Sequence, residues 1–129
     1  MSLLAIDHGT SKCGLAIEIA GIALPLWTVP TKDIVGRLKT IVSERNIDTI
    51  IIGIAKHVNG QPSKQSALQR TFAGRISSYF PDCQVILWDE RFTTSEARLS
   101  LEETGSNWNG NIDDMAASIL LQSYLEARS

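Results

Sequence analysis

Residues 48–54 read Asp-Thr-Ile-Ile-Ile-Gly-Ile, a stretch that is β-branched and apolar almost throughout. A strand in which apolar and polar residues do not alternate is buried on both faces, and such strands lie inside parallel sheets. We therefore expect residues 48–54 to form the central strand of an α/β sheet that is flanked by helices.

The chain before this strand predicts an antiparallel part of the same sheet. Three apolar segments with turn residues between them are expected to be strands: residues 3–7, 13–19 and 22–29. Pro25 lacks the N–H that a ladder needs, which places the third of these strands at the sheet edge. After Pro30 the apolar residues recur at helical spacing, and Thr31 is expected to cap the helix that they form.

The chain after residue 54 predicts helices that alternate with one more strand. Helices are expected over residues 63–80, 94–103 and 112–127, and a buried strand over residues 84–89. Right-handed crossovers place the fourth strand beside the first and the fifth beyond it. The predicted fold is a mixed five-stranded sheet of order 3-2-1-4-5, with the second strand antiparallel and with helices on its faces.

Acidic residues follow two of the predicted parallel strands and begin the last helix. Asp7 ends the first strand, and Glu90 comes directly after the fifth. Asp113 lies on a mostly apolar helix face, which it shares with Ala116, Ala117, Leu120 and Tyr124. That face should pack on the sheet, so the three carboxylates can converge at the carboxyl ends of the strands. Taken singly, Asp7 could instead cap a turn, Glu90 form a surface ion pair and Asp113 cap the helix.

Converging carboxylates indicate a particular chemistry. Like charges that meet at one site disfavour one another unless a cation lies between them. Oxygen ligands without His or Cys favour Mg²⁺ or Mn²⁺. Two such ions can activate water and stabilise the leaving oxygen of a phosphodiester. The pattern therefore predicts two Mg²⁺ or Mn²⁺ ions and phosphodiester hydrolysis.

Basic residues gather in the middle of the chain. Residues 49–81 contain no acid and hold five basic side chains: Lys56, His57, Lys64, Arg70 and Arg75. Lys56 and His57 follow the central strand at the edge where the acids are expected, which favours a surface that contacts phosphates. The alternative is a set of solvated helix positions, and we favour it for Arg75.

The three tryptophans have different surroundings in the sequence. Trp27 and Trp88 lie in apolar strand contexts and are expected to pack in the core. Trp108 lies in a polar loop, where core packing and base stacking both stay open.

Composition excludes several classes of protein. A net charge of −2 argues against a protein that coats nucleic acid by charge alone, although a local basic patch remains compatible with it. No apolar run approaches the roughly 18 residues of a membrane span. Met1–Ile6 lacks the basic region of a secretory signal. Cys13 and Cys83 have no metal-binding spacing, so we expect two reduced thiols in a cytoplasmic protein.

Four motifs in order along nearly the whole chain carry a resemblance to a known family. They are Asp7-His8-Gly9-Thr10 with Gly14-Leu15-Ala16, Gly53-Ile54 with Asn59-Gly60, Asp89-Glu90-Arg91-Phe92-Thr93-Thr94, and Ile112-Asp113 with Ala116-Ala117 and Ile119-Leu120-Leu121-Gln122. The chain resembles the YqgF/RuvX family of ribonuclease H-like proteins, described as pre-16S rRNA nucleases or as Holliday junction resolvase-like proteins.

The resemblance implies one ribonuclease H-like nuclease domain over residues 1–129. It implies a metal-dependent endonuclease whose catalytic and metal-binding residues are Asp7, Glu90 and Asp113, with Asp114 as an auxiliary or helix-capping residue. The expected nucleic-acid-binding residues are Lys12, Lys56, Arg70 and Arg91. The implied substrate is structured RNA, with trimming of the 5′ end of precursor 16S rRNA as the reaction and ribosome-assembly particles as further partners.

Two other functions stay open on the same residues. A Holliday junction resolvase would cut branched DNA and would need a homodimer rather than a monomer. A nucleic-acid-binding module would bind without turnover.

The chain also departs from the family pattern in having Ser11-Lys12 for a Lys-Arg pair, Ala55 for a proline, and Asn111 near a common lysine. Because all three acids are present, these departures bear on substrate binding more than on metal chemistry.

Overall fold

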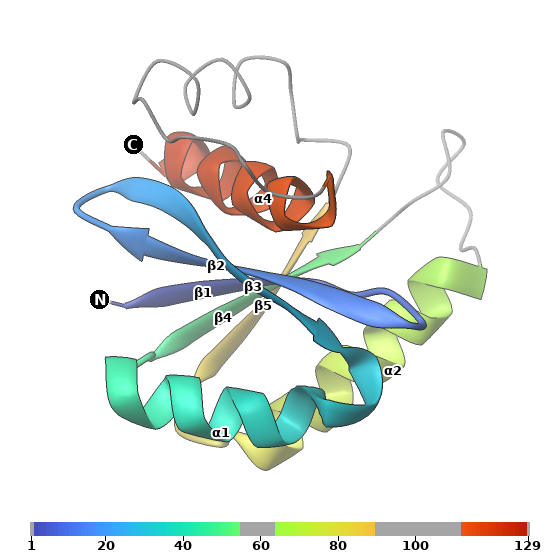
Figure 1. The fold of residues 1–129 in the computed structure, drawn as a ribbon. Helices are drawn as coiled ribbons and strands as arrows, with labels where there is room; N and C mark the ends of the chain where they lie inside the picture. The colour runs from blue at the N-terminus through green and yellow to red at the C-terminus, as the bar shows by residue number, and fades with distance from the viewer. Residues whose placement is uncertain (1, 55–63, 90–111, 129) are drawn as a thin grey trace.

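The computed structural model describes residues 2–54, 64–89 and 112–128, with the backbone alone for residue 65 and residues 112–114. In this part of the chain, one mixed sheet has the order β3-β2-β1-β4-β5, as predicted (Figure 1). Its strands are β1 (Leu3–Asp7), β2 (Lys12–Ile19), β3 (Ile22–Pro30), β4 (Thr49–Ile54) and β5 (Gln84–Asp89). β1 pairs antiparallel with β2 and parallel with β4, as predicted.

Helices cover both faces of this sheet. The helices α1 (Ile34–Arg45) and α2 (Lys64–Tyr79) lie on one face, and α4 (Ile112–Arg128) lies on the other (Figure 1). The helix expected over residues 94–103 falls outside the described residues. In the described ranges, no helix combines the length and the apolar character that crossing a membrane requires.

The alternation of β1 divides the core into two layers. Leu4 and Ile6 pack in the cluster that includes residues of α1 and α2, whereas Leu3 and Ala5 pack in the cluster that includes residues of α4. Every residue of β4 is buried, and β4 lies between β1 and β5, which confirms that the isoleucine-rich stretch is an interior strand. The middle strand of the five is β1, not β4 as the sequence predicted.

The strand β5 differs from the buried strand that its apolar sequence predicts. β5 is an edge strand of the sheet and is only partly buried, and its Leu87 is 42% exposed. A strand at the end of a sheet has one neighbouring strand instead of two, so its side chains are covered less completely. Trp88 does pack inward as expected: its Nε1 donates a hydrogen bond of 3.2 Å to Ser123 Oγ, and its ring meets Tyr124 edge-on at 5.3 Å.

Trp27 contradicts the prediction that it packs in the core, because it is 47% exposed. The cause is a β-bulge. Gly14 pairs with Thr28 and Ala16 with Pro25, so β3 carries one residue more than β2 between these pairs. A bulge on an edge strand leaves a residue unpaired and re-aims its side chain. The ring of Trp27 is partly covered by the guanidinium of Arg37 on α1, 5.6 Å from the ring centroid.

The start of α1 also differs from the prediction. Thr31 makes no capping bond to the helix but begins a single turn of 3₁₀ helix, η1 (Thr31–Asp33), and α1 follows from Ile34. The hydroxyl of Thr31 instead donates to the carbonyl oxygen of Gly9, which competes with its use as a cap. The two cysteines agree with expectation in being free thiols, with Cys13 buried and Cys83 half-buried.

One buried side chain joins α4 to the edge strand β3. The Oε1 atom of Gln122 accepts a hydrogen bond of 3.3 Å from the backbone N–H of Ala23. Both residues are buried, so this bond satisfies a polar group of each away from water.

Candidate active site

Asp7 lies at the carboxyl end of β1, between an antiparallel and a parallel neighbour. It pairs with Gly14 of β2, and the residue before it, Ile6, pairs with Ile52 of β4. Leu3 and Ala5 point toward α4, so the alternation of the strand directs the half-buried side chain of Asp7 toward the same face. This is the edge at which sites form in open α/β sheets.

Glycines stand on both sides of Asp7 in the sheet. Gly14 is its direct partner on β2. One further step of the β1–β4 register brings Asp7 level with Gly53, which in turn pairs with Trp88 of β5. Neither glycine places a side chain beside the carboxylate of Asp7 in this row of the sheet.

The helix α4, which packs over this face of the sheet, carries the third predicted metal ligand in its first turn. Asp113 lies in the first turn of α4, and its side chain falls outside the described part. Ala117 and Leu120, which share its predicted helix face, are buried against residues of β1. The small side chain of Ala117 lets the helix approach the sheet closely. The backbone therefore agrees with the predicted face.

Glu90 lies outside the described residues. The last residue of β5 is Asp89, which pairs with Ile54 at the end of β4. Among the described residues, no three His, Cys, Asp or Glu side chains gather at one place. Two of the three predicted ligands have side chains outside that set, so the convergence of the carboxylates stays a prediction.

The loop after Asp7 contains a contact that the sequence analysis missed. The ring of His8 stacks on that of Phe72 from α2, with centroids 4.3 Å apart and an interplanar angle of 28°. Burial lowers the pKa of His8, and the positive charge of Arg75 lowers it further. Phe72 and Arg75 lie three positions apart on one helix face, so α2 meets the loop beside Asp7 with both side chains.

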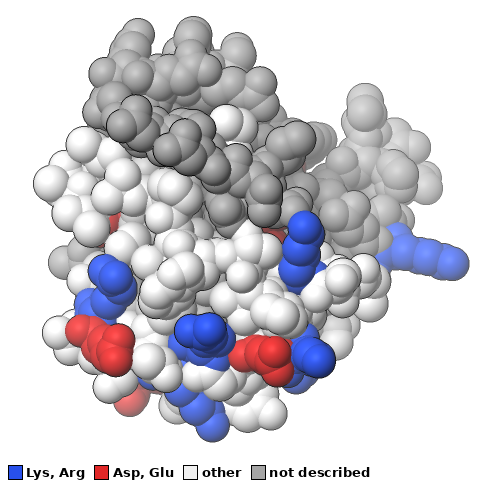
Figure 2. Space-filling model, in the orientation of Figure 1, with Lys and Arg blue, Asp and Glu red and all other residues white. Residues whose placement is uncertain are grey.

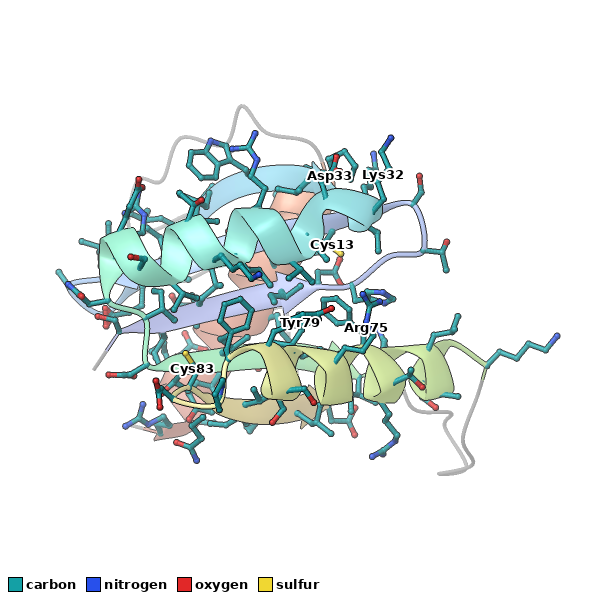
Figure 3. All side chains as sticks on the ribbon, turned by 90° about the horizontal axis from the view of Figure 1, so that it is seen from below. Cys13, Lys32, Asp33, Arg75, Tyr79 and Cys83 are labelled. Atoms are coloured by element: carbon teal, nitrogen blue, oxygen red, sulfur yellow. The ribbon has the colours of Figure 1, made fainter. Side chains whose placement is uncertain are left out.

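Of the predicted nucleic-acid-binding residues, the structure describes Lys12 and Arg70. Lys12 begins β2, is exposed, and pairs with Pro30 of β3. Arg70 is exposed on α2, and Lys56 and Arg91 lie outside the described residues. Arg75 is exposed, as expected for a solvated helix position, yet its charge acts on His8. Figure 3 shows Arg75 on α2 and Lys32 at the start of α1, on either side of Cys13.

Charges of both signs mix over the rest of this side of the molecule. Figure 2 shows Lys and Arg side chains interspersed with Asp and Glu on the face seen in Figure 1, in agreement with the small net charge. On the described surface seen in this view, no patch of one sign stands apart. Recognition of a polyanion at Asp7 would therefore rest on a few local side chains rather than on the overall field.

The residues present at Asp7 fit a divalent cation. The carboxylate stands at a strand end beside two residues without side chains, and the nearest predicted ligands are carboxylates as well. Oxygen ligands of this kind suit Mg²⁺ and Mn²⁺. The thiol of Cys13 points away from this face, since Cys13 packs in the opposite core layer with Leu15.

Comparisons with known proteins found a matching family model and similar proteins of known name. A family model described as "RuvX: Holliday junction resolvase" matches residues 1–127. A protein named "Putative pre-16S rRNA nuclease" from Flavobacterium johnsoniae is 35% identical, over 98% of this chain and 96% of its own length. The protein of the same name from Chloroflexus aurantiacus is 34% identical, over 98% of this chain and 87% of its own length.

A solved structure shares the fold over nearly the full length. RuvC from Thermus thermophilus, in complex with a Holliday junction substrate, matches with a TM-score of 0.64 and 16% identity, covering 99% of this chain and 95% of that one. This likeness and the sheet order confirm the predicted ribonuclease H-like fold.

Proposed function

The chain belongs to the RuvX family, and we propose that it is a metal-dependent endonuclease that hydrolyses phosphodiester bonds at the 5′ end of precursor 16S rRNA. The observation that carries this proposal is the position of Asp7. It ends a central parallel strand, faces the helix that begins at Ile112, and stands beside Gly14. The names of the relatives that match over nearly the whole chain support structured RNA as the substrate.

We assign the metal ligands to Asp7, Glu90 and Asp113. When bound there, Mg²⁺ or Mn²⁺, as a pair of ions, would supply the positive charge that activates water and stabilises the leaving oxygen. Asp7 comes from a strand with neighbours on both sides, so its backbone is held in place before any ion binds. Such preorganisation gives a catalytic carboxylate its geometry without cost at the moment of reaction.

We assign the contacts with the substrate backbone to basic side chains around this edge. The assigned residues are Lys12, Lys56, Arg70 and Arg91. Lys12 is the one that lies nearest to Asp7 in the described fold, since β2 begins with it and pairs with β1. A single phosphate contact of this kind adds affinity without sequence preference.

The setting of the protein follows from this substrate. We propose that residues 1–129 act as one nuclease domain in the cytoplasm, where ribosome-assembly particles would present the precursor RNA. A monomer suffices for cutting one RNA strand, whereas symmetric cutting of a four-way DNA junction needs a homodimer. The description of the matching family model favours junction cleavage as the second candidate function.

The test is a cleavage assay on two labelled substrates. RNA that carries a 16S 5′ leader and a four-way DNA junction are each incubated with Mg²⁺, Mn²⁺ or chelator. The variants are Asp7→Asn, Glu90→Gln and Asp113→Asn. Matched controls are Asp82→Asn and Glu44→Gln, because both side chains are exposed and lie away from the carboxyl ends of the strands.

Each outcome of this assay selects one function. Metal-dependent cutting of the RNA by the wild type and the two controls, lost in the three site variants, supports the proposal. Cutting of the junction with the same pattern replaces it with the resolvase. Binding of RNA without cutting, unaffected by the site variants, makes the chain a binding module. Normal turnover by folded Asp7→Asn removes Asp7 from the site.

A further inference from the structure

The side chain of Thr31 joins the loop after Asp7 to the turn that begins α1. Its Oγ1 donates a hydrogen bond of 2.7 Å to the carbonyl oxygen of Gly9, 22 positions earlier in the chain. Its backbone N–H donates a second bond of 2.9 Å to the carbonyl oxygen of Ser11. One residue thus fixes two carbonyl groups of the same short loop.

A thiol extends this connection into the core. The Sγ of Cys13 lies 3.5 Å from Thr31 Oγ1. A hydroxyl has one proton, and that of Thr31 is donated to Gly9, so the thiol must be the donor of the second bond. Burial raises the pKa of Cys13, which keeps the thiol protonated for this role. Figure 3 shows Cys13 on the sheet beside the start of α1.

Most of the loop between β1 and β2 lies at the surface. Thr10, Ser11 and Lys12 are exposed, so burial contributes little to their positions. A Cβ atom at Gly9 would collide with the carbonyl oxygen of Lys12, which shows how tightly the backbone folds there. His8 is held on the other side by Phe72.

We propose that Thr31 is a positioning residue for the reaction at Asp7. It holds the loop of residues 8–11 against η1 and thereby sets the direction of the carboxylate at one end of the loop and of Lys12 at the other. The proposal rests on the proposed function, since it takes Asp7 as the metal ligand. The hydroxyl touches neither substrate nor ion in this role and acts through the backbone of Gly9.

The expected size of the effect follows from the geometry. Displacing a reacting group by about 1 Å can cost roughly 100-fold in rate, even when the mutated residue lies outside the chemistry. Thr31→Val keeps the shape of the side chain and removes the hydrogen bonds of Oγ1, while the backbone bond to Ser11 stays. Thr31→Ser restores the hydroxyl without the methyl group. Thr40→Val is the matched control, because Thr40 is exposed on α1.

Three measurements test the proposal. They are kcat and KM for metal-dependent cleavage, the binding of Mn²⁺ by the free protein, and hydrogen–deuterium exchange of residues 8–12. For Thr31→Val we expect kcat to fall about 10- to 100-fold, Mn²⁺ binding to weaken, and exchange in the loop to accelerate. Thr31→Ser should recover most of each quantity, and Thr40→Val should match the wild type.

The outcomes separate this proposal from the function on which it rests. If Asp7→Asn is inactive and folded Thr31→Val has normal kcat and Mn²⁺ binding, the positioning role is wrong and the nuclease stands. A loss in Thr31→Val that Thr31→Ser does not recover is also evidence of a purely structural role. If Asp7→Asn cleaves and binds Mn²⁺ normally, Asp7 is not a metal ligand, and the positioning role of Thr31 falls with that assignment. Should Thr31→Val not fold, Thr31→Ala removes the same hydrogen bond without placing a methyl group where the hydroxyl was.

Discussion

Asp7 and Gly14 lie directly opposite each other in the antiparallel pairing of β1 and β2. Side chains at directly opposed positions project from the same face with their Cβ atoms about 5 Å apart. Any side chain at residue 14 would therefore stand beside the carboxylate of Asp7, on the face that α4 covers. Gly14 itself places no side chain there.

Replacing Gly14 by alanine should separate activity from stability. The added methyl group lies beside Asp7, so we expect metal-dependent cleavage to fall about tenfold, equivalent to about 1.4 kcal/mol in the barrier. Stability should be kept or slightly raised, because glycine weakens a strand interior. Steady-state cleavage and thermal unfolding of the same preparation measure both quantities.

Gly36→Ala is the control for this prediction. A Cβ atom at Gly36 meets no atom within 4 Å, and the residue lies inside α1. The substitution should therefore stabilise the protein by about 0.5–1 kcal/mol without changing cleavage. If Gly14→Ala retained the full cleavage rate, the space beside Asp7 would be irrelevant to the reaction.

The stack of His8 on Phe72 should make stability depend on pH. Burial, and then the charge of Arg75, hold the pKa of His8 below its usual value in the folded protein. When the pH falls through about 6.5, His8 binds a proton in the unfolded chain but not yet in the folded protein. The free energy of unfolding therefore decreases on acidification. The Tm, measured with chelator between about pH 7.5 and about pH 5.5, should fall more for the wild type than for His8→Phe. Equal pH dependence of the two proteins would contradict the assignment.

The two thiols should differ in reactivity toward a thiol reagent. Burial raises the pKa of both, and for Cys83 the charges of Asp48 and Asp82 raise it further. Because the thiolate is the reacting form, labelling should be slower than for an ordinary cysteine at pH about 8 and should still accelerate above pH about 9. The absorbance of the released reagent should show one early phase from half-buried Cys83, absent in Cys83→Ser. Buried Cys13 should react with the reagent only when the protein unfolds.

The fully buried strand β4 should contribute strongly to stability. Ile51 is fully buried, packs in the layer beneath α4, and pairs with both Ala5 and Ile86. We expect Ile51→Ala to lower the free energy of unfolding by about 2–5 kcal/mol, since it removes buried methyl groups and leaves a cavity. Denaturant titration measures this change. Leu87→Ala on the exposed side of β5 should cost far less.

The order of the sheet could be predicted because local patterns determine it. The isoleucine run of residues 50–52 shows no alternation, which places it inside the sheet, and crossovers of fixed hand then place β1 and β5. The exposure of Trp27 could not be predicted in this way. It depends on one extra residue in β3 relative to β2, and the composition of neither strand reveals that mismatch.

The candidate site likewise contains residues that could be predicted from the sequence and residues that could not. Asp7 could be located because an acid at the end of an apolar strand has a defined place in the fold. The role of Thr31 could not, because its partner Gly9 is distant in sequence and the position also suits an ordinary helix cap. His8 and Arg75 come together only through the packing of α2 on the sheet. Contacts of this kind between side chains on separate elements leave no periodic signal.

The hydrogen bond from Ala23 to Gln122 bears on how copies of the chain can meet. Ala23 lies on β3, a strand at the end of the sheet, where free backbone groups can recruit a strand from another molecule. Its amide is instead occupied by a side chain of its own helix α4. At this position the molecule is therefore closed to extension of its sheet by a second copy. Replacing Gln122 by leucine would unmask that amide and open a route to edge-to-edge aggregation.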